Sequence, residues 1–232
     1  MKRVFCLILV LTLLLCGCGK PEEPVSGQVT PRETETAGVP AEPERTVSLG
    51  RVEGGEYRNE YVGYGCKLDS SWTFYSAEEL QELPADIAEQ MEGSQLGDMA
   101  EQLTQISDMM AENVDMLTSI NVLYTKLGMQ ERLSYAVLTE KQILEAVLSQ
   151  QDMLMDAYSQ AGIEVSAMEL VTLSFLGQER YAIHTTATMQ GIPYYTLQVY
   201  DYHLGAYGVV TTFASYVEDN TASLPELFYS IG

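Results

Sequence analysis

The chemistry that this chain could perform starts with two thiols, Cys16 and Cys18, which lie at the end of an apolar run. Two cysteines this close suggest redox exchange, metal coordination or a covalent attachment point. A redox pair is normally Cys-x-x-Cys, with two residues between the thiols instead of one. A metal site needs further His or Cys ligands, and residues 19–58 contain neither. We therefore interpret the pair as an attachment point.

The residues before this pair have the pattern of a secretory signal. Lys2 and Arg3 form a positive start, and the 13 residues Val4–Cys16 are almost wholly apolar. As a helix this run would be only ~20 Å long, whereas a membrane span needs roughly 20 residues. A positive start, a short apolar centre and small residues after it are typical of a cleaved leader.

The sequence Leu15-Cys16-Gly17-Cys18 resembles the bacterial lipoprotein signal, in which a Leu and a small residue precede an invariant Cys. The resemblance implies that this Cys receives a diacylglycerol and becomes the mature N-terminus after cleavage. Cys18 fits, because Gly17 precedes it and Leu15 lies three positions back, whereas Cys16 directly follows the bulky Leu15. We predict lipid attachment at Cys18, with membrane lipid as its partner. The protein is then expected on the outer face of the bacterial cytoplasmic membrane.

Cys66 is the only thiol in the body of the chain. The alternation of Tyr64, Cys66 and Leu68 with other residues predicts that these three share one face of a strand. A buried free Cys behaves as a small hydrophobe, and this is the interpretation we favour. The alternatives are a nucleophile, which would need a neighbouring base, and an intermolecular disulfide.

The chain has two histidines, His184 and His203. Asp201 and His203 are expected to share a strand face, so a carboxylate–histidine pair is sterically possible. Two His without a pair of Cys do not make a typical structural zinc site. Nucleotide-binding, serine-hydrolase, zinc-protease and calcium-loop motifs are absent from the sequence. We therefore predict no catalytic, metal-binding or cofactor-binding residues and interpret both histidines as surface or turn residues.

The composition argues against some partners. The chain has 232 residues and a net charge of −21, from 33 acidic and 12 basic side chains. Such a surface repels phosphate backbones, so a nucleic-acid partner is not expected. Hydrophobic residues make up 46% of the chain, which is enough for a packed core.

The chain divides into three parts. Residues 1–17 are the predicted signal peptide, and residues 18–50 are the lipidated N-terminus and a linker rich in Pro, Glu and Thr. Five of the eight prolines fall in the second part, and a segment of this composition cannot bury enough apolar surface to fold. Residues 51–232 are expected to form one domain, since all 15 tyrosines lie at or after Tyr57.

The patterns within the domain predict both strands and helices. The predicted strands cover 64–68, 72–74, 119–127, 164–175, 180–189, 194–203 and 207–215, with turns at Gly177, Gly191 and Gly205. Capping boxes predict helices that begin at Ser76 and at Thr139, the latter ending at Gly162, and a short last helix is expected at 222–230. A further helix after residue 94 is predicted from Leu96, Leu103, Met110 and Leu117, which recur every seven residues.

This order of elements is α+β in type, with an antiparallel sheet sandwiched by helices. It resembles the PsbP-like and DcrB-like domains and, most of all, uncharacterised lipoproteins of Gram-positive bacteria. The sequence markers are NEYVGYGCKLDSSWTFYS, SINVLYTKL and the closing SLPELFYSI. The resemblance implies a fold whose members mostly bind or assist other proteins and have no common active site.

These observations predict a membrane-anchored, non-catalytic binding or accessory module whose partner is a protein or a cell-wall component. Two sets of residues could form its binding surface, although packing in the core is the simpler interpretation of both. They are Met91, Met99, Met109, Met110 and Met116, and Tyr194, Tyr195, Tyr200, Tyr202 and Tyr207. A hydrolase or thiol enzyme is the alternative function, and a solute receptor of a transporter, which usually has two lobes, ranks below it.

Overall fold

The computed structural model describes residues 48–90, 105–160 and 162–231, without the side chains of 84–90 and 202–204. The strands are β1 (Arg51–Glu53), β2 (Glu56–Asn59), β3 (Tyr64–Lys67), β4 (Thr73–Phe74), β5 (Gln105–Asn113), β6 (Thr118–Lys126), β7 (Ile163–Phe175), β8 (Gln178–Met189), β9 (Ile192–Leu204), β10 (Tyr207–Tyr216) and β11 (Phe228–Ser230). The helices are α2 (Ala77–Gln90), α4 (Met129–Tyr135), α5 (Glu140–Leu148), α6 (Gln151–Gln160) and the 3-10 helix η2 (Thr221–Leu227). The predicted signal peptide, Cys18 and the linker up to residue 47 lie outside the described residues.

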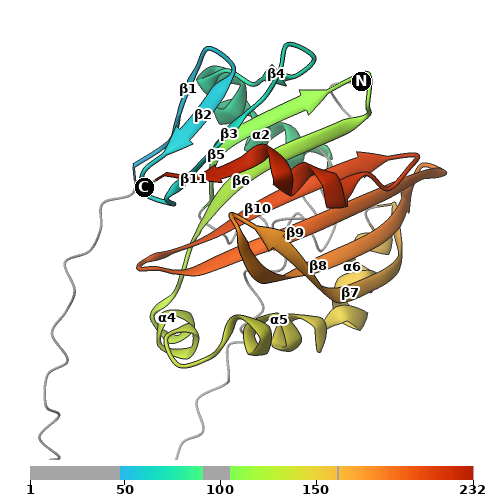
Figure 1. Ribbon diagram of the computed structural model, residues 1–232. Helices are drawn as coiled ribbons and strands as arrows, with labels where there is room; N and C mark the ends of the chain where they lie inside the picture. Colours follow the sequence, from blue (N-terminus) through green and yellow to red (C-terminus); the bar gives the residue numbers. More distant parts are fainter. Residues whose placement is uncertain (1–47, 91–104, 161, 232) are drawn as a thin grey trace, which may run out of the picture.

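A seven-stranded antiparallel sheet forms the centre of the fold, in the order β4-β5-β6-β10-β9-β8-β7. One face packs against α2, α5 and α6, whose Leu83, Ile143 and Tyr158 belong to one hydrophobic cluster. The other face packs against η2 and a small four-stranded sheet with the order β1-β2-β3-β11. Figure 1 shows α5 below the large sheet and the strands β1, β2 and β3 of the small sheet above it. The predicted α+β class with an antiparallel sheet is confirmed, and the small sheet is an additional layer.

The strand β6 shows why this sequence forms a central strand. Ile120, Val122 and Tyr124 belong to the cluster beneath the small sheet, whereas Leu123 belongs to the cluster beneath the helices. Both faces of the strand are therefore buried, a position that favours β-branched and aromatic residues. β6 pairs with β5 and β10, so the strand predicted at 119–127 is confirmed.

The strands β7 to β10 form the predicted meander, in which each strand pairs with the next. Two-residue turns, Leu176-Gly177 and Gln190-Gly191, join the first three strands with φ between 53° and 80°. Turns with positive φ match the twist of the strands that they connect. The turns expected at Gly177, Gly191 and Gly205 are confirmed.

The capping box at Thr139 is confirmed by reciprocal hydrogen bonds. The Gln142 N–H donates to the Thr139 hydroxyl at 3.3 Å, and the Thr139 N–H donates to the Gln142 side chain at 2.9 Å. The single helix predicted from there to Gly162 is two helices, α5 and α6, with a break after Leu148. The Ser149 hydroxyl donates to the Ala146 carbonyl, and such side-chain bonds weaken a helix by competing for backbone groups. Gly162, at φ +76°, has the predicted left-handed conformation.

The helix predicted from the seven-residue spacing is wrong in its described part. Met110 lies in the strand β5, and Leu117 lies in the following turn at φ +51°. β5 pairs with β6 and is buried on both faces over much of its length. Apolar residues therefore occur at successive positions, and the alternation of apolar and polar residues that marks a strand with one exposed face is absent. Leu96 and Leu103 lie outside the described residues.

Two further elements differ from the prediction. The residues predicted as a last helix form η2, which contains Pro225, and then the strand β11, which pairs with β3. The short helix α4 is not predicted, because no side chain of this helix is buried. Its Met129 and Leu133 are 79% and 66% exposed, so they show no pattern of burial.

Candidate functional site

The methionines and tyrosines singled out from the sequence mostly belong to the core. Met109, Met110, Tyr194 and Tyr200 are each 1% exposed, and Tyr195 and Tyr207 are half-buried. Only Met116, in the turn between β5 and β6, reaches 50% exposure. Met91, Met99 and the Tyr202 side chain lie outside the described part of the chain. Packing in the core therefore explains the described members of both sets except Met116.

Cys66 is buried in β3 with an exposed fraction of 0%. It lies in the cluster between the small and large sheets, together with Tyr64 and Leu68. Burial raises the pKa of the Cys66 thiol to about 12, so the reactive thiolate is scarce at neutral pH. The interpretation of Cys66 as a small buried hydrophobe is confirmed.

We expect Cys66 to be unreactive in the folded protein. In a variant with Cys6, Cys16 and Cys18 changed to Ser, a chromogenic thiol reagent at pH 8 should label Cys66 roughly 100-fold more slowly in buffer than in urea, because labelling requires both exposure and the thiolate. Labelling at the same rate in both conditions would place the thiol at the surface and reopen the nucleophile hypothesis.

The carboxylate of the Asp201 and His203 pair is engaged elsewhere. Arg180 donates from Nη2 to Asp201 at 2.8 Å and from Nε to Glu140 at 2.7 Å. It thereby ties β8 to β9 and to the start of α5. The His203 side chain is outside the described residues, so the pair itself is not seen. Asp201 has a structural partner, and the hypothesis of a hydrolase gains no support from it.

His184 has a carboxylate partner that the sequence did not indicate. Its Nε2 lies 2.9 Å from Oδ2 of Asp219, and Oδ1 of Asp219 accepts hydrogen bonds from the N–H and hydroxyl of Thr221. Burial acts to raise the pKa of Asp219, but these hydrogen bonds and the nearby histidine lower it below its ordinary value. Within the described ranges, no group of three or more His, Cys, Asp or Glu side chains is placed to hold a metal ion. The pair links β8 to the segment after β10.

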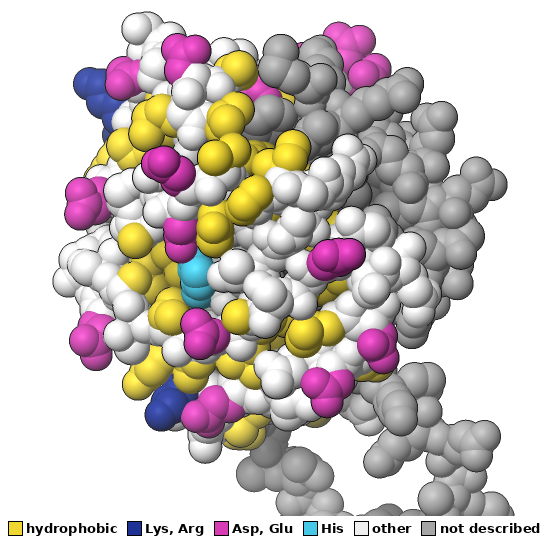
Figure 2. Space-filling model, turned by 90° about the vertical axis from the view of Figure 1, so that its right-hand side faces the viewer, with side chains coloured by type: hydrophobic (Ala, Val, Ile, Leu, Met, Phe, Trp, Pro, Cys, Tyr) yellow, Lys and Arg dark blue, Asp and Glu magenta, His cyan; other side chains and the backbone are white. Residues whose placement is uncertain are grey.

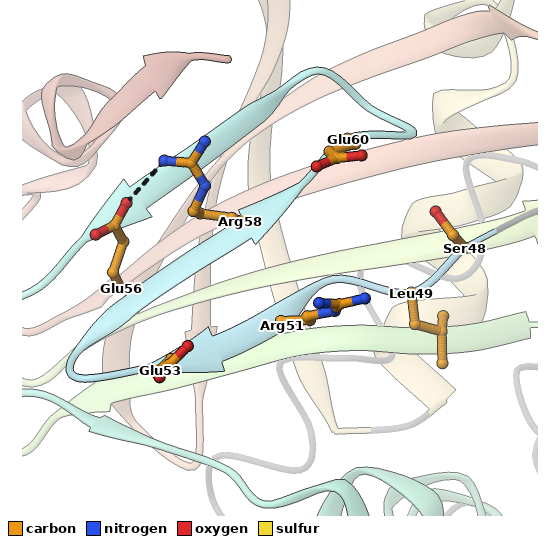
Figure 3. Close-up of a pocket in the computed structure, with 7 residues that line it drawn as sticks. All are labelled: Ser48, Leu49, Arg51, Glu53, Glu56, Arg58 and Glu60. Atoms are coloured by element: carbon orange, nitrogen blue, oxygen red, sulfur yellow. Dashed lines mark hydrogen bonds and ion pairs between the residues drawn. The ribbon is translucent and has the colours of Figure 1, made fainter.

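A charged groove of about 410 Å³ lies on the outer side of the hairpin made by β1 and β2 (Figure 3). It is lined by Ser48, Leu49, Arg51, Glu53, Glu56, Arg58 and Glu60. The hairpin turn is Gly54-Gly55, with φ of +59° and +81°, a conformation that glycine adopts without strain. We take this groove as the candidate functional site, since it gathers charged side chains in a hollow of the surface.

Asp108 on β5 fixes the hairpin to the large sheet. Its Oδ2 accepts hydrogen bonds from the Tyr57 hydroxyl at 2.5 Å and from Asn59 Nδ2 at 2.6 Å, and its Oδ1 accepts one from the Gly50 N–H at 2.7 Å. The side chains of Tyr57 and Asn59 lie on the buried face of β2. Successive side chains of a strand point to opposite faces, so those of Glu56 and Arg58 point outward into the groove. Burial raises the pKa of Asp108 and outweighs the hydrogen bonds, which act to lower it.

The charges of the groove are only partly paired. Arg58 Nη1 lies 3.3 Å from Glu56 Oε1, and the Arg58 guanidinium lies 6.0 Å from the centre of the Tyr229 ring. Arg51 makes no ion pair with any residue that the structure describes. Figure 3 shows Arg58 turned toward Glu56, whereas Arg51 is turned toward Leu49. The groove contains neither His nor Cys, and its chemistry suits recognition of a polar surface.

This groove is not among the sites predicted from the sequence, although the sequence contains a signal for its hairpin. The stretch RVEGGEYR, Arg51–Arg58, has the same order of charges when read from either end around its two glycines. Two glycines between short runs of alternating residues are a hairpin signal, and the mirrored charges would then lie side by side on one face.

The acidic composition is visible at the surface. Figure 2 shows a face of the molecule on which Asp and Glu side chains outnumber Lys and Arg side chains. No helix in the described part of the chain is long and apolar enough to span a membrane.

Comparisons with known proteins find similarity among solved structures but not among family models or curated proteins. No family model matches the sequence, and no curated protein matches it either. The chain is similar to the solution structure of cyanobacterial PsbP (CyanoP) from Synechocystis sp. PCC 6803, with a TM-score of 0.41 and 11% identity, over 80% of this chain and 94% of that chain.

Proposed function

We propose that this chain is a lipid-anchored extracytoplasmic lipoprotein whose domain is a non-catalytic binding or accessory module. The observation that carries the proposal is the sequence Leu15-Cys16-Gly17-Cys18 at the end of a short apolar leader. In this arrangement Cys18 holds the lipid, and the following residues up to 50 separate the domain from the outer face of the cytoplasmic membrane. Two acyl chains suffice for stable anchoring, since each buried methylene contributes about 0.8 kcal/mol.

Two features of the domain support a binding role. The groove presents charged side chains on a hairpin whose position is fixed, because Asp108 accepts hydrogen bonds from Tyr57 and Asn59 of that hairpin. Neither Cys66, which is buried, nor Asp201, which is paired with Arg180, is placed for catalysis. The partner that fits the groove is a protein or a cell-wall component, since the net negative charge of the chain disfavours nucleic acid.

The anchor is tested by labelling growing bacterial cells with an alkyne-tagged fatty acid. We expect the wild-type chain to carry the label and Cys18→Ala to lose it and keep its leader, because the Cys18 thiol is the acylated atom. Cys16→Ala is the matched control and should keep the label. Labelling that depends on Cys16 would move the anchor to that residue, and absence of label from the wild-type chain would overturn the proposal.

A further inference from the structure

We propose that the outer edge of β1 pairs with β1 of a second copy of this chain, so that two small sheets join across a twofold axis. β1 is the end strand of its sheet, and Figure 1 shows it at the outer edge of the molecule. The inference names a partner for the candidate site and rests on the proposed function in one respect, namely that a shared membrane brings copies together.

The backbone of β1 has hydrogen-bonding groups that point away from its sheet. Because Gly54 and Gly55 form a two-residue turn, Glu53 and Glu56 on either side of it form a hydrogen-bonded pair. Bonded and non-bonded pairs alternate along an antiparallel ladder, so the N–H and C=O of Val52 are directed away from β2. No backbone hydrogen bond reaches Val52 from that side among the described residues. The edge is therefore open to another strand.

The outward side chains of the hairpin stand in like-charge pairs. Arg51 lies directly opposite Arg58, and Glu53 lies directly opposite Glu56. Like charges in these positions destabilise a sheet. The ion pair between Arg58 and Glu56, at 3.3 Å, offsets part of this repulsion between like charges. Arg51 and Glu53, both on the exposed edge strand, have no such partner in the part of the chain that the structure describes.

A second copy supplies the missing opposite charges. An antiparallel copy of β1 centred on Val52 places Arg51 opposite the partner's Glu53, and Glu53 opposite the partner's Arg51. The two Val52 residues then exchange both backbone hydrogen bonds, and their side chains, each 45% exposed in the single chain, cover one another. Short length and charged side chains are the usual means by which an edge strand avoids pairing, but the order Arg-Val-Glu in β1 is complementary to itself when reversed.

The contact is short, so pairing depends on concentration. A strand of three residues offers few backbone hydrogen bonds, and ion pairs exposed to water contribute little each. Chains tethered to the same surface meet at a high effective concentration. We therefore expect dimers among anchored chains and mostly monomers in dilute solution.

Disulfide cross-linking of the full chain in intact cells tests the pairing. The Cα atoms of a hydrogen-bonded antiparallel pair lie about 5.5 Å apart, within the range of a disulfide. Val52→Cys should therefore form a covalent dimer of this chain on mild oxidation. Val137→Cys is the matched control, because Val137 is 81% exposed and lies outside the small sheet; it should stay monomeric.

Charge exchange separates specific pairing from chance collision. In the Val52→Cys background, Arg51→Glu should lower the dimer yield roughly five-fold or more, since like charges then face each other across the edge. Adding Glu53→Arg to that variant should restore the yield. The pairing would be overturned if no dimer formed, if the dimer yield did not change with these charge substitutions, or if Val52→Cys cross-linked to a different protein. Lipid labelling at Cys18 is read separately, so a dimer without label, or label without a dimer, shows which proposal has failed.

Discussion

Asp108→Ala should lower the free energy of unfolding by about 3 kcal/mol, because hydrogen bonds to a charged group contribute about 1.5–3 kcal/mol each and buried donors that lose their acceptor are costly. The Tyr57 hydroxyl and the Gly50 N–H would both lose Asp108 as acceptor, whereas Asn59 Nδ2 keeps a bond to the Tyr124 hydroxyl at 2.7 Å. Urea unfolding of both proteins measures the difference. The β1–β2 hairpin and its groove should become mobile first.

The matched control for this variant is Asp115→Ala, which removes an exposed carboxylate from the neighbouring turn. It should change the free energy of unfolding by less than about 0.5 kcal/mol. An equal loss in both variants would show that Asp108 has no special role in holding the hairpin.

The pH dependence of the free energy of unfolding is a second test of the role of the Asp108 carboxylate. Burial raises the pKa of folded Asp108 above its unfolded value of about 3.9. A raised pKa means that its stabilising contribution is complete below the unfolded pKa and is lost as the pH rises through the folded pKa. The stability of the wild type relative to Asp108→Asn, which cannot ionise at this position, should therefore fall as the pH increases from 4 to 7. A relative stability that rises over this range would mean that the hydrogen bonds outweigh burial.

Phe213→Ala should have the largest effect, a loss of about 3–5 kcal/mol, which is typical of removing a buried aromatic ring. Phe213 on β10 is 0% exposed. The centre of its ring lies 6.1 Å from that of Phe175 on β7 and 5.5 Å from that of Phe228 on β11. The Phe228 ring also lies 5.6 Å from Tyr64 on β3. These rings join the small sheet to the large one. The hydrogen-bonded strands around Phe213 cannot move to fill the cavity that its removal would leave.

Urea unfolding followed by Trp72 fluorescence and by circular dichroism measures this loss. Trp72 is the only tryptophan and packs against the same cluster, so its fluorescence reports on the contact between the sheets. Phe213→Leu keeps an apolar side chain that fills part of the space and should cost clearly less than Phe213→Ala. Leu133→Ala, at a position that is 66% exposed, should cost less than about 0.5 kcal/mol. A loss below about 1 kcal/mol for Phe213→Ala would contradict the importance of this cluster.

The elements that could be predicted from the sequence depend on residues that are close in the chain. The capping box joins Thr139 to Gln142, and the turns at Gly177 and Gly191 need positive φ at single positions. The strands β7 to β10 follow one another with short turns, so their antiparallel pairing needed no knowledge of distant segments. The burial of Cys66 followed from its apolar neighbours on one strand face.

The candidate site could not be predicted in the same way, because its parts come from separate segments. Asp108 lies 58 residues from Gly50 and 49 residues from Asn59, and no local pattern indicates that they meet. The same holds for His184 and Asp219, which are 35 residues apart. The spacing that suggested a helix at Met110 failed because pairing with β6 overrode the local periodicity.

The sequence by itself therefore determined the α+β class, the meander, the capped start of α5 and the prediction of an anchor at Cys18, since these follow from local conformation and from short motifs. Only the tertiary structure decided that β5 is a strand, that a second sheet covers the first, and that a carboxylate from β5 holds the β1–β2 hairpin in place. The physical reason is that burial and hydrogen bonding between distant segments contribute more to folding than local propensity does.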